Sequence, residues 1–557
     1  MGVVVANELT LGIAQMALEP ELRQNLAKMA IMIRQAKLKQ CRAVFFPEAA
    51  LTCAPHTPKI EIDLGLQALA DHARKNGIYV AFGYLDRVSD EGRLFNAVKV
   101  FDPQGEEILH YEKMWDVKKG SSPILFEIDG VLFGAIICAD RWLRGVEDLP
   151  AFGGAKILVE FSNNFADEWL PDQEWFWYRP RAVRNGVFSV FANTAQFEDY
   201  RDHGHLVDGH GHSAVFGPDG HCVSALANEV DHLLVCDIDP TRATGEAVQK
   251  RKDHPLIGRF WSDDFEPQKD ALEWQGLHAQ EKTLTFAAAQ MQCYEDVDSN
   301  MALMRAQMGT AAKQGADVIV FPELAVTGAL DKDVEAADET TLEMALDMLC
   351  VSAKTLGICV VFGMPFFDAG KRYNGVFVIG AEGRLLTRHA QVGVGRPHLF
   401  AEGDTLETMW FDFQGVPVAI LLGMTEVLWS EMAEMAALRG AQVIMHLCHD
   451  GGDPLFRRQL WANIASFGTL TVTVNAASNP ANGGSAIWED YRRHKKKAPY
   501  SRAPYSAVRI AEAYTGEELL YATQTMRAKN PHMQRVVERD PDRRGWYENG
   551  GWLIGGR

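Results

Sequence analysis

The chain has 557 residues, of which 47% are apolar and 23% charged, which is the composition of an ordinary globular protein. This length exceeds what one hydrophobic core serves and predicts two domains of about 250 to 300 residues each. A formal net charge of −19 disfavours nucleic acid and anionic membranes as partners, because both require basic surfaces. Nine cysteines spread singly, with no CxxC pair, favour neither a disulfide framework nor a zinc site.

The N-terminal residues and the apolar runs favour a cytoplasmic protein. The start Met-Gly-Val-Val-Val-Ala-Asn-Glu has no basic region and only a very short apolar run, unlike a secretory signal. The longest apolar runs are about ten residues, whereas about 20 are needed to span a bilayer. We therefore expect no membrane partner.

The first half of the chain alternates short apolar strands with helices of amphipathic period. Residues 8–16 are predicted to form a strand, residues 22–40 a helix, and residues 42–48 a buried strand that ends in Pro-Glu. Residues 94–101 and 107–112 are predicted to be paired strands, joined by a Pro-Gln-Gly turn. This alternation indicates an α/β layered domain.

The same order of elements recurs about 275 residues later. Residues 283–291, Thr-Leu-Thr-Phe-Ala-Ala-Ala-Gln-Met, repeat the first strand, and residues 316–323, Ala-Asp-Val-Ile-Val-Phe-Pro-Glu, repeat the Pro-Glu strand. Such self-similarity indicates a duplicated domain. The stretch between the copies is polar and without period, so it is predicted to be a linker. The predicted organisation is a first domain over residues 1–262, a linker over 263–282 and a second domain over 283–557.

The stretch from Gly130 to Trp142, Gly-Val-Leu-Phe-Gly-Ala-Ile-Ile-Cys-Ala-Asp-Arg-Trp, is predicted to be a core strand that ends at a thiol. Ligands of open α/β folds bind at the carboxyl ends of such strands, so Cys138 is a candidate nucleophile. A small buried hydrophobe is the alternative interpretation of this cysteine. Glu48 and Lys113 also stand at the ends of predicted strands, and with Cys138 they form a candidate catalytic set.

In this order and in these strand contexts, the three residues resemble the signature of the nitrilase, or carbon–nitrogen hydrolase, superfamily. That signature has a Glu after a Pro-Glu strand, a Lys after a later strand, and a Cys followed by x-Asp. The resemblance covers nearly the whole first half and, in weakened form, the second. It implies two tandem αββα four-layer α/β sandwich domains that pack as an intramolecular pseudo-dimer. It also implies chemistry that needs no cofactor and no metal.

The resemblance further implies a hydrolase that cleaves a non-peptide C–N bond of a small amide or N-carbamoyl compound through a thioester on Cys138. A free thiol has a pKa near 8.5, so it needs activation at neutral pH. Glu48 would take the thiol proton, and the Lys113 ammonium would favour the thiolate. Lys113 and the backbone N–H of Ala139 would stabilise the oxyanion.

Three other functions stay open: a nitrile hydrolase, a glutaminase-like enzyme that releases ammonia for a partner, and a non-catalytic interaction protein. The Asp in the Cys-x-Asp sequence favours amides over nitriles. Many family members carry a further Glu between the Lys and the Cys, and Asp116 is the only early carboxylate of that segment here. Three residues that follow the nucleophile or the next predicted strand, residues 156–159, are expected to line the same cleft: Trp142, Glu160 and Asn163.

Five histidines between residues 203 and 221 invite a metal interpretation, but their spacing is interrupted by glycines and has no flanking cysteine. We therefore predict no metal site. The segment is expected to be a rim that contributes to the choice of a small-molecule substrate.

The second half is predicted to lack the catalyst. The repeated Pro-Glu strand gives Glu323 as the counterpart of Glu48. Counting from matching turn glycines gives Gln391 as the counterpart of Lys113 and Gly423 as that of Cys138. Because glycine has no nucleophilic group, one active site is predicted, and the second domain is expected to be a structural or regulatory partner. Thr425 and Cys448 are the alternative nucleophiles of that half. Further homo-oligomerisation stays open.

Overall fold

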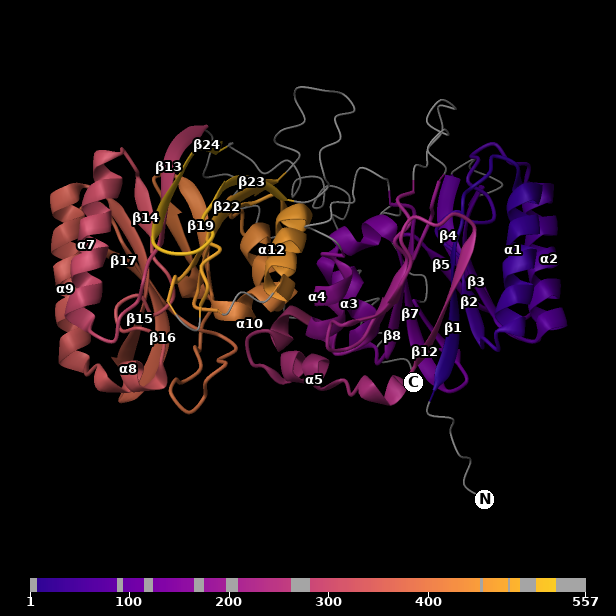
Figure 1. Cartoon of the computed structure of the whole chain (residues 1–557), viewed down its shortest axis with the longest axis horizontal. Coiled ribbons are helices and arrows are strands. Elements are labelled where there is room, and N and C mark those ends of the chain that lie inside the picture. The colour runs from indigo at the N-terminus through magenta and orange to yellow at the C-terminus, as the bar shows by residue number, and fades with distance from the viewer. Residues whose placement is uncertain are drawn as a thin grey trace, which may run out of the picture.

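The computed structural model describes residues 8–87, 94–114, 124–164, 175–196, 209–261, 281–450, 454–478, 481–490 and 507–526. The described strands form four six-stranded sheets, two in each half of the chain (Figure 1). Among the helices of these residues, none is both long enough and apolar enough to cross a membrane.

The first sheet of the first half has the order β12-β1-β2-β3-β4-β5. Its strands are β1 (Leu9–Gln15), β2 (Ala43–Phe45), β3 (Tyr79–Arg87), β4 (Leu94–Phe101), β5 (Glu107–Glu112) and β12 (His232–Ile238). The second sheet has the order β11-β10-β9-β8-β7-β6. Its strands are β6 (Leu125–Ile128), β7 (Val131–Ile137), β8 (Ile157–Ser162), β9 (Phe188–Asn193), β10 (Ala214–Phe216) and β11 (Cys222–Ala225).

Helices lie on the outer face of each of these sheets. The helices α1 (Leu22–Leu38) and α2 (Lys59–Asn76) cover the first sheet, and α3 (Arg144–Phe152) and α4 (Tyr178–Asn185) cover the second (Figure 1). The inner faces of the two sheets pack together, and the rings of Phe45 and Phe133 lie 5.9 Å apart there. Central strands are therefore buried on both faces, which explains their continuous apolar runs.

The second half repeats this arrangement. One sheet has the order β17-β16-β15-β14-β13-β24, from β13 (Lys282–Gln290), β14 (Val318–Val320), β15 (Cys359–Asp368), β16 (Lys371–Ile379), β17 (Leu385–Ala390) and β24 (Glu518–Met526). The other has the order β18-β19-β20-β21-β22-β23, from β18 (Trp410–Phe413), β19 (Val416–Leu422), β20 (Val443–Cys448), β21 (Leu470–Asn475), β22 (Ala486–Asp490) and β23 (Ala507–Glu512). The longer helices are α7 (Val297–Lys313), α9 (Glu339–Leu356), α11 (Ser430–Leu438) and α12 (Pro454–Phe467); α8 (Asp331–Ala336) and α10 (Gly423–Leu428) are shorter.

The two halves meet through their inner helices. Figure 1 shows α3 and α4 beside α10 and α12 in the middle of the molecule, while α1 and α2 lie at one end and α7 and α9 at the other. A cluster of apolar side chains fills this interface, with Trp177 and Phe191 from the first half and Trp461 and Trp488 from the second. The eight layers thus form an αββα–αββα pseudo-dimer within one chain, which confirms the predicted fold class.

Candidate active site

Glu48 is held by a close crossing of two backbone segments. The segment after β2 lies against β3, where the Phe46 N–H donates to the Ala81 carbonyl at 2.8 Å and the Gly83 N–H donates to the Pro47 carbonyl at 3.1 Å. A Cβ at position 83 would lie 2.6 Å from the Cα of Glu48, far inside van der Waals contact. Glycine is therefore required there, and the close approach fixes the position of the Glu48 side chain.

Lys113 and Asn96 both contact one carboxylate oxygen of Glu48. The Lys113 Nζ donates to Glu48 Oε1 at 2.7 Å, and the Asn96 Nδ2 donates to the same oxygen at 2.6 Å. Lys113 directly follows β5, and its backbone N–H donates to the Asn96 carbonyl at 2.8 Å. Both members of the ion pair are buried, so water screens their attraction little.

Asn96 is not among the site residues predicted from the sequence, although the internal repeat contains a signal for it. Leu94-Phe-Asn-Ala-Val in the first half matches Arg372-Tyr-Asn-Gly-Val in the second, so the Asn occurs in both copies. In each half this Asn donates to the glutamate that follows Phe-Pro, Asn96 to Glu48 and Asn374 to Glu323.

Cys138 begins a 3₁₀ helix, η1 (Cys138–Trp142), directly after β7. Its φ is +44°, a left-handed conformation that costs an L-residue about 1 to 2 kcal/mol. The neighbouring Asp140 holds this turn, because its Oδ2 accepts from the Ile137 N–H at 2.9 Å and from the Tyr111 hydroxyl at 2.6 Å. Packing and hydrogen bonds thus present the thiol at the strand end in a strained conformation.

A second amide lies beside the thiol. The Cys138 Sγ is 3.6 Å from Asn164 Oδ1, and Arg141 Nη2 donates to the same oxygen at 2.7 Å. Tyr178 accepts from Asn164 Nδ2 at 2.7 Å, and Asn193 accepts from the Asn164 backbone N–H at 2.8 Å. Sequence reasoning selected Asn163 rather than Asn164, because the pattern did not show which of the two adjacent amides faces the thiol.

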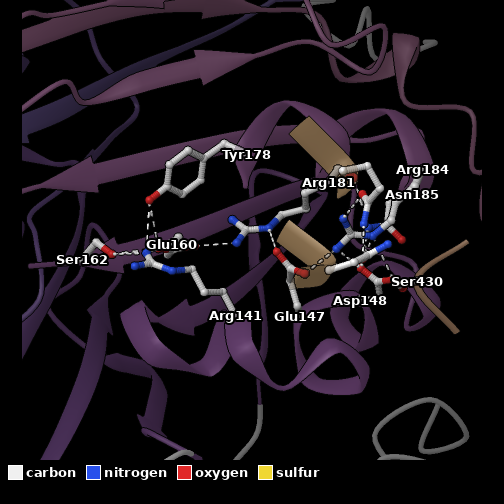
Figure 2. A network of polar contacts seen from close by, with 12 residues as sticks. Arg141, Glu147, Asp148, Glu160, Ser162, Tyr178, Arg181, Arg184, Asn185 and Ser430 are labelled. Atoms are coloured by element: carbon white, nitrogen blue, oxygen red, sulfur yellow. Dashed lines mark hydrogen bonds and ion pairs between the residues drawn. The ribbon is translucent and has the colours of Figure 1, made fainter. Parts of the chain in front are cut away.

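The residues predicted to line the cleft are distributed differently from expectation. The prediction that Glu160 follows the end of a strand is wrong. It lies inside β8, which runs to Ser162 instead of ending at residue 159, and its side chain is fully buried. Its carboxylate accepts from Arg141 at 2.6 Å and from Ser162 at 2.7 Å, so it contacts other buried side chains of the first half (Figure 2). Asn163 accepts from the Thr194 hydroxyl at 2.6 Å.

The other predicted residues fall in three different settings. Trp142 packs against the apolar cluster between the two halves. Ala139 is the second residue of η1 and is largely buried. Asp116 lies outside the described residues.

The second half shows what surrounds the position that corresponds to Cys138. Gly423 also has a left-handed φ, +68°, and a Cβ built on it would lie 3.6 and 3.7 Å from the two carboxylate oxygens of Glu323. The same Cβ would lie 2.6 Å from Gln391 Nε2. The turn at Gly423 therefore faces Glu323 and Gln391, the residues that correspond to Glu48 and Lys113.

Hydrogen bonds connect the polar side chains of this second-half site. Asn374 Nδ2 donates to Glu323 Oε1 at 2.7 Å and to Gln391 Oε1 at 3.1 Å, and Gln391 Nε2 donates to the Leu422 carbonyl at 3.2 Å. Burial raises the pKa of Glu323 to about 7, although the donated hydrogen bond from Asn374 opposes the rise. The alternative nucleophile Cys448 is fully buried, and burial raises the pKa of its thiol well above the usual value.

No group of three or more His, Cys, Asp or Glu side chains is placed to hold a metal ion within the described ranges. Two of the five histidines of the predicted rim, His203 and His205, lie outside those ranges. His210 is buried beside Asn193, and burial lowers its pKa well below the usual value.

The sequence pattern of the carbon-nitrogen hydrolase family matches the chain twice, over residues 10–245 and over residues 285–493. The chain belongs to this family, with one copy of the fold in each half.

Several curated proteins are similar to parts of the chain. A protein described as "Hydrolase in pqqF 5'region", from Pseudomonas protegens, is 28% identical over 184 residues, which are 31% of this chain and 60% of that protein. The omega-amidase NIT2 of Danio rerio is 25% identical over 251 residues, 41% of this chain and 87% of the enzyme. A formamidase of Bacillus thuringiensis is 25% identical over 152 residues, 25% of this chain and 43% of the enzyme. The match thus spans less than two thirds of the first and third of these relatives.

A solved structure, a mutant amidase of the nitrilase superfamily from Nesterenkonia AN1, shares 20% sequence identity at a TM-score of 0.39. That comparison covers 47% of this chain and 100% of the amidase.

Proposed function

We propose that the first half is an amidase-type hydrolase that cleaves a non-peptide C–N bond of a small amide or N-carbamoyl compound. The observation that carries this proposal is the buried Glu48–Lys113 ion pair at one strand end, together with a thiol in a left-handed turn at the end of β7. Membership of the carbon-nitrogen hydrolase family supports it, and so do the relatives named as amidases.

In the proposed reaction, Glu48 removes the proton from the Cys138 thiol, and the sulfur attacks the carbonyl carbon of the substrate. The tetrahedral oxyanion is stabilised by the Lys113 ammonium and by the backbone N–H of Ala139. Glu48 then gives its proton to the leaving nitrogen, the C–N bond breaks, and a thioester on Cys138 remains. A water molecule, deprotonated by Glu48, attacks the thioester carbon. The C–S bond breaks, the carboxylic acid leaves, and Glu48 returns the proton to the sulfur of Cys138.

We assign this chemistry to a first domain over residues 1–262. The second domain, over residues 283–557, is proposed to be catalytically degenerate. Gln391 has no charge with which to stabilise a thiolate or an oxyanion, and Gly423 has no nucleophile. Because the family fold is complete in both halves, the loss concerns side chains of the site and not the architecture.

The test is to trap the acyl-enzyme and to weigh it by intact mass spectrometry, with a panel of amides, N-carbamoyl compounds and nitriles as substrates. We expect an adduct on Cys138 whose mass identifies the acyl group, and neither adduct nor turnover in Cys138→Ala. Cys222→Ala is the matched control, because Cys222 is an exposed cysteine on the edge strand β11. Turnover retained in Cys138→Ala would refute the proposal.

A further inference from the structure

Eight buried charged side chains form a continuous series of ion pairs that runs from the Cys138 site to the second half of the chain. In order they are Arg141, Glu160, Arg181, Glu147, Arg184, Asp148, Arg251 and Glu431. We refer to them as the ion-pair chain, of which Figure 2 shows the part from Arg141 to Asp148. Each member is at most 3% exposed. Four arginines alternate with four carboxylates, so the series has no net charge.

The first end of the ion-pair chain contacts the site. Arg141 lies in η1, the same turn that bears Cys138, and it donates through Nη2 to the Asn164 oxygen that lies 3.6 Å from the thiol. Its other terminal nitrogen, Nη1, donates to Glu160 at 2.6 Å. The direction of the guanidinium, and with it the position of the Asn164 amide, therefore depends on where Glu160 is held.

Successive members of the ion-pair chain connect this end to the helices at the interface between the halves. Arg181, on α4, contacts Glu160 and also donates through Nε to Glu147 on α3 at 2.7 Å. Arg184 contacts Glu147 and donates to Asp148 Oδ1 at 2.7 Å. Since α3 begins two residues after η1 ends, the same short segment bears the thiol and two of the carboxylates.

The last charge comes from the second half. Arg251, on α5 (Glu246–Asp253), donates to Asp148 Oδ2 at 2.6 Å and to Glu431 Oε1 at 2.8 Å. Ser430, which begins α11, donates to the same oxygen of Asp148 at 2.8 Å. Two adjacent residues of the second half therefore contact this far end of the series.

Charge balance makes Glu431 necessary. The seven members that belong to the first half are four arginines and three carboxylates, so Glu431 supplies the fourth negative charge of the series. An excess charge in a buried series is strongly unfavourable, and the remaining groups rearrange to reduce the cost. Without the Glu431 charge, Arg251 competes with Arg184 for Asp148, and each shift is passed to the next pair.

We propose that Glu431 is a positioning residue for Cys138 and acts through the ion-pair chain on Arg141 and Asn164. The half without a catalyst thereby controls the geometry of the site in the other half. This inference rests on the proposed function of Cys138 as the nucleophile.

The test compares Glu431→Gln with wild type in the full chain. The substitution keeps the size of the side chain and an acceptor for Arg251 but removes the charge. We expect kcat to fall by about tenfold to a hundredfold, the size of effect that small displacements of a catalytic group produce, with KM changed less than about twofold. The pH profile for alkylation of Cys138 by iodoacetamide, followed by peptide mass spectrometry, is expected to shift as well. A role in stability alone would move neither readout at temperatures where the variant is folded.

Two further variants sharpen the test. Glu407→Gln is the matched control, because it removes an exposed carboxylate whose partner, Arg439, directly follows the same helix as Glu431, and it is expected to change nothing. The double variant Arg251→Gln/Glu431→Gln leaves three arginines and three carboxylates, again neutral, and is expected to recover most of the lost kcat. Unchanged kinetics and alkylation in folded Glu431→Gln, or no recovery in the double variant, would overturn the proposal.

If Glu431→Gln does not fold, Ser430→Ala takes its place, because it removes only one hydrogen bond to Asp148. It must lower kcat and shift the alkylation profile, and wild-type behaviour would overturn the proposal. Alkylation is measured without substrate, so it reports on the thiol even if the substrate class is wrong. Turnover retained in Cys138→Ala, by contrast, refutes the proposed function regardless of the kinetics of Glu431→Gln.

Discussion

The buried carboxyl of Glu323 is expected to make the stability of the second half depend on pH. Burial is the largest cause that raises its pKa, to about 7 from an ordinary value of 4.5. The difference corresponds to about 3 kcal/mol, since each pKa unit is equivalent to about 1.4 kcal/mol. Between these two pH values the folded protein keeps a proton that the unfolded chain has released. The stability that this group supplies is therefore full below about pH 4.5 and is lost as the pH rises to about 7.

The assay is urea unfolding of wild type and of Glu323→Gln at intervals from pH 4.5 to 8, followed by tryptophan fluorescence. Glutamine does not ionise, so the difference in unfolding free energy between the two proteins isolates the titration of this one group. We expect that difference to change by about 3 kcal/mol across the range, with wild type losing stability relative to the variant as the pH rises. Glu382→Gln, at an exposed carboxylate of the same half, is the matched control. A constant difference for Glu323→Gln would refute the reasoning.

Three shorter predictions follow from the same structure. Cys138→Gly and Cys138→Ala are both expected to be inactive. The glycine variant should be more stable than the alanine variant by about 1 kcal/mol in urea unfolding, because φ at this position is +44°. Equal stabilities of the two variants would show that the turn is not strained. Gly423→Cys is expected to lower stability by about 2 kcal/mol and to give no turnover in a Cys138→Ala background, since its Cβ meets Gln391 and no ammonium is present. Residues 1–262 expressed alone are expected to self-associate or aggregate in size-exclusion chromatography with light scattering, because the apolar side chains that contact the second half become exposed. A stable, fully active monomer would contradict a structural role of the second half.

The fold was predictable because the duplication was visible in the sequence. Short apolar strands, each followed by a helical period, recur in the same order, and that pattern is imposed by sheets that are covered on both faces. The positions of Glu48, Lys113 and Cys138 at strand ends followed from the same pattern, since an apolar run stops where polar groups begin. Sequence therefore indicated which residues stand at the carboxyl ends of strands.

Which side chains contact one another was not predictable in the same way. Asn164 and the ion-pair chain join segments separated by tens to hundreds of residues, and periodicity contains no information about such pairs. Glu160 illustrates the error that results: a charged residue in an apolar run was interpreted as the end of a strand. Two arginines from distant segments neutralise it, so the strand continues through it and its side chain is buried.

The proposed loss of the catalyst in the second half involves two linked replacements. In the first half the Lys113 ammonium neutralises the buried Glu48 carboxylate. Gln391 has no charge to offer Glu323, so burial raises the pKa of that carboxyl to about 7 and it is partly protonated at neutral pH. Gln391 also lies where a side chain on Gly423 would stand, 2.6 Å from the position of its Cβ. Once the lysine is replaced by glutamine, the thiol has neither space nor an activating charge, and glycine suits the left-handed turn without strain. Neither replacement can therefore be reversed alone to restore a second active site.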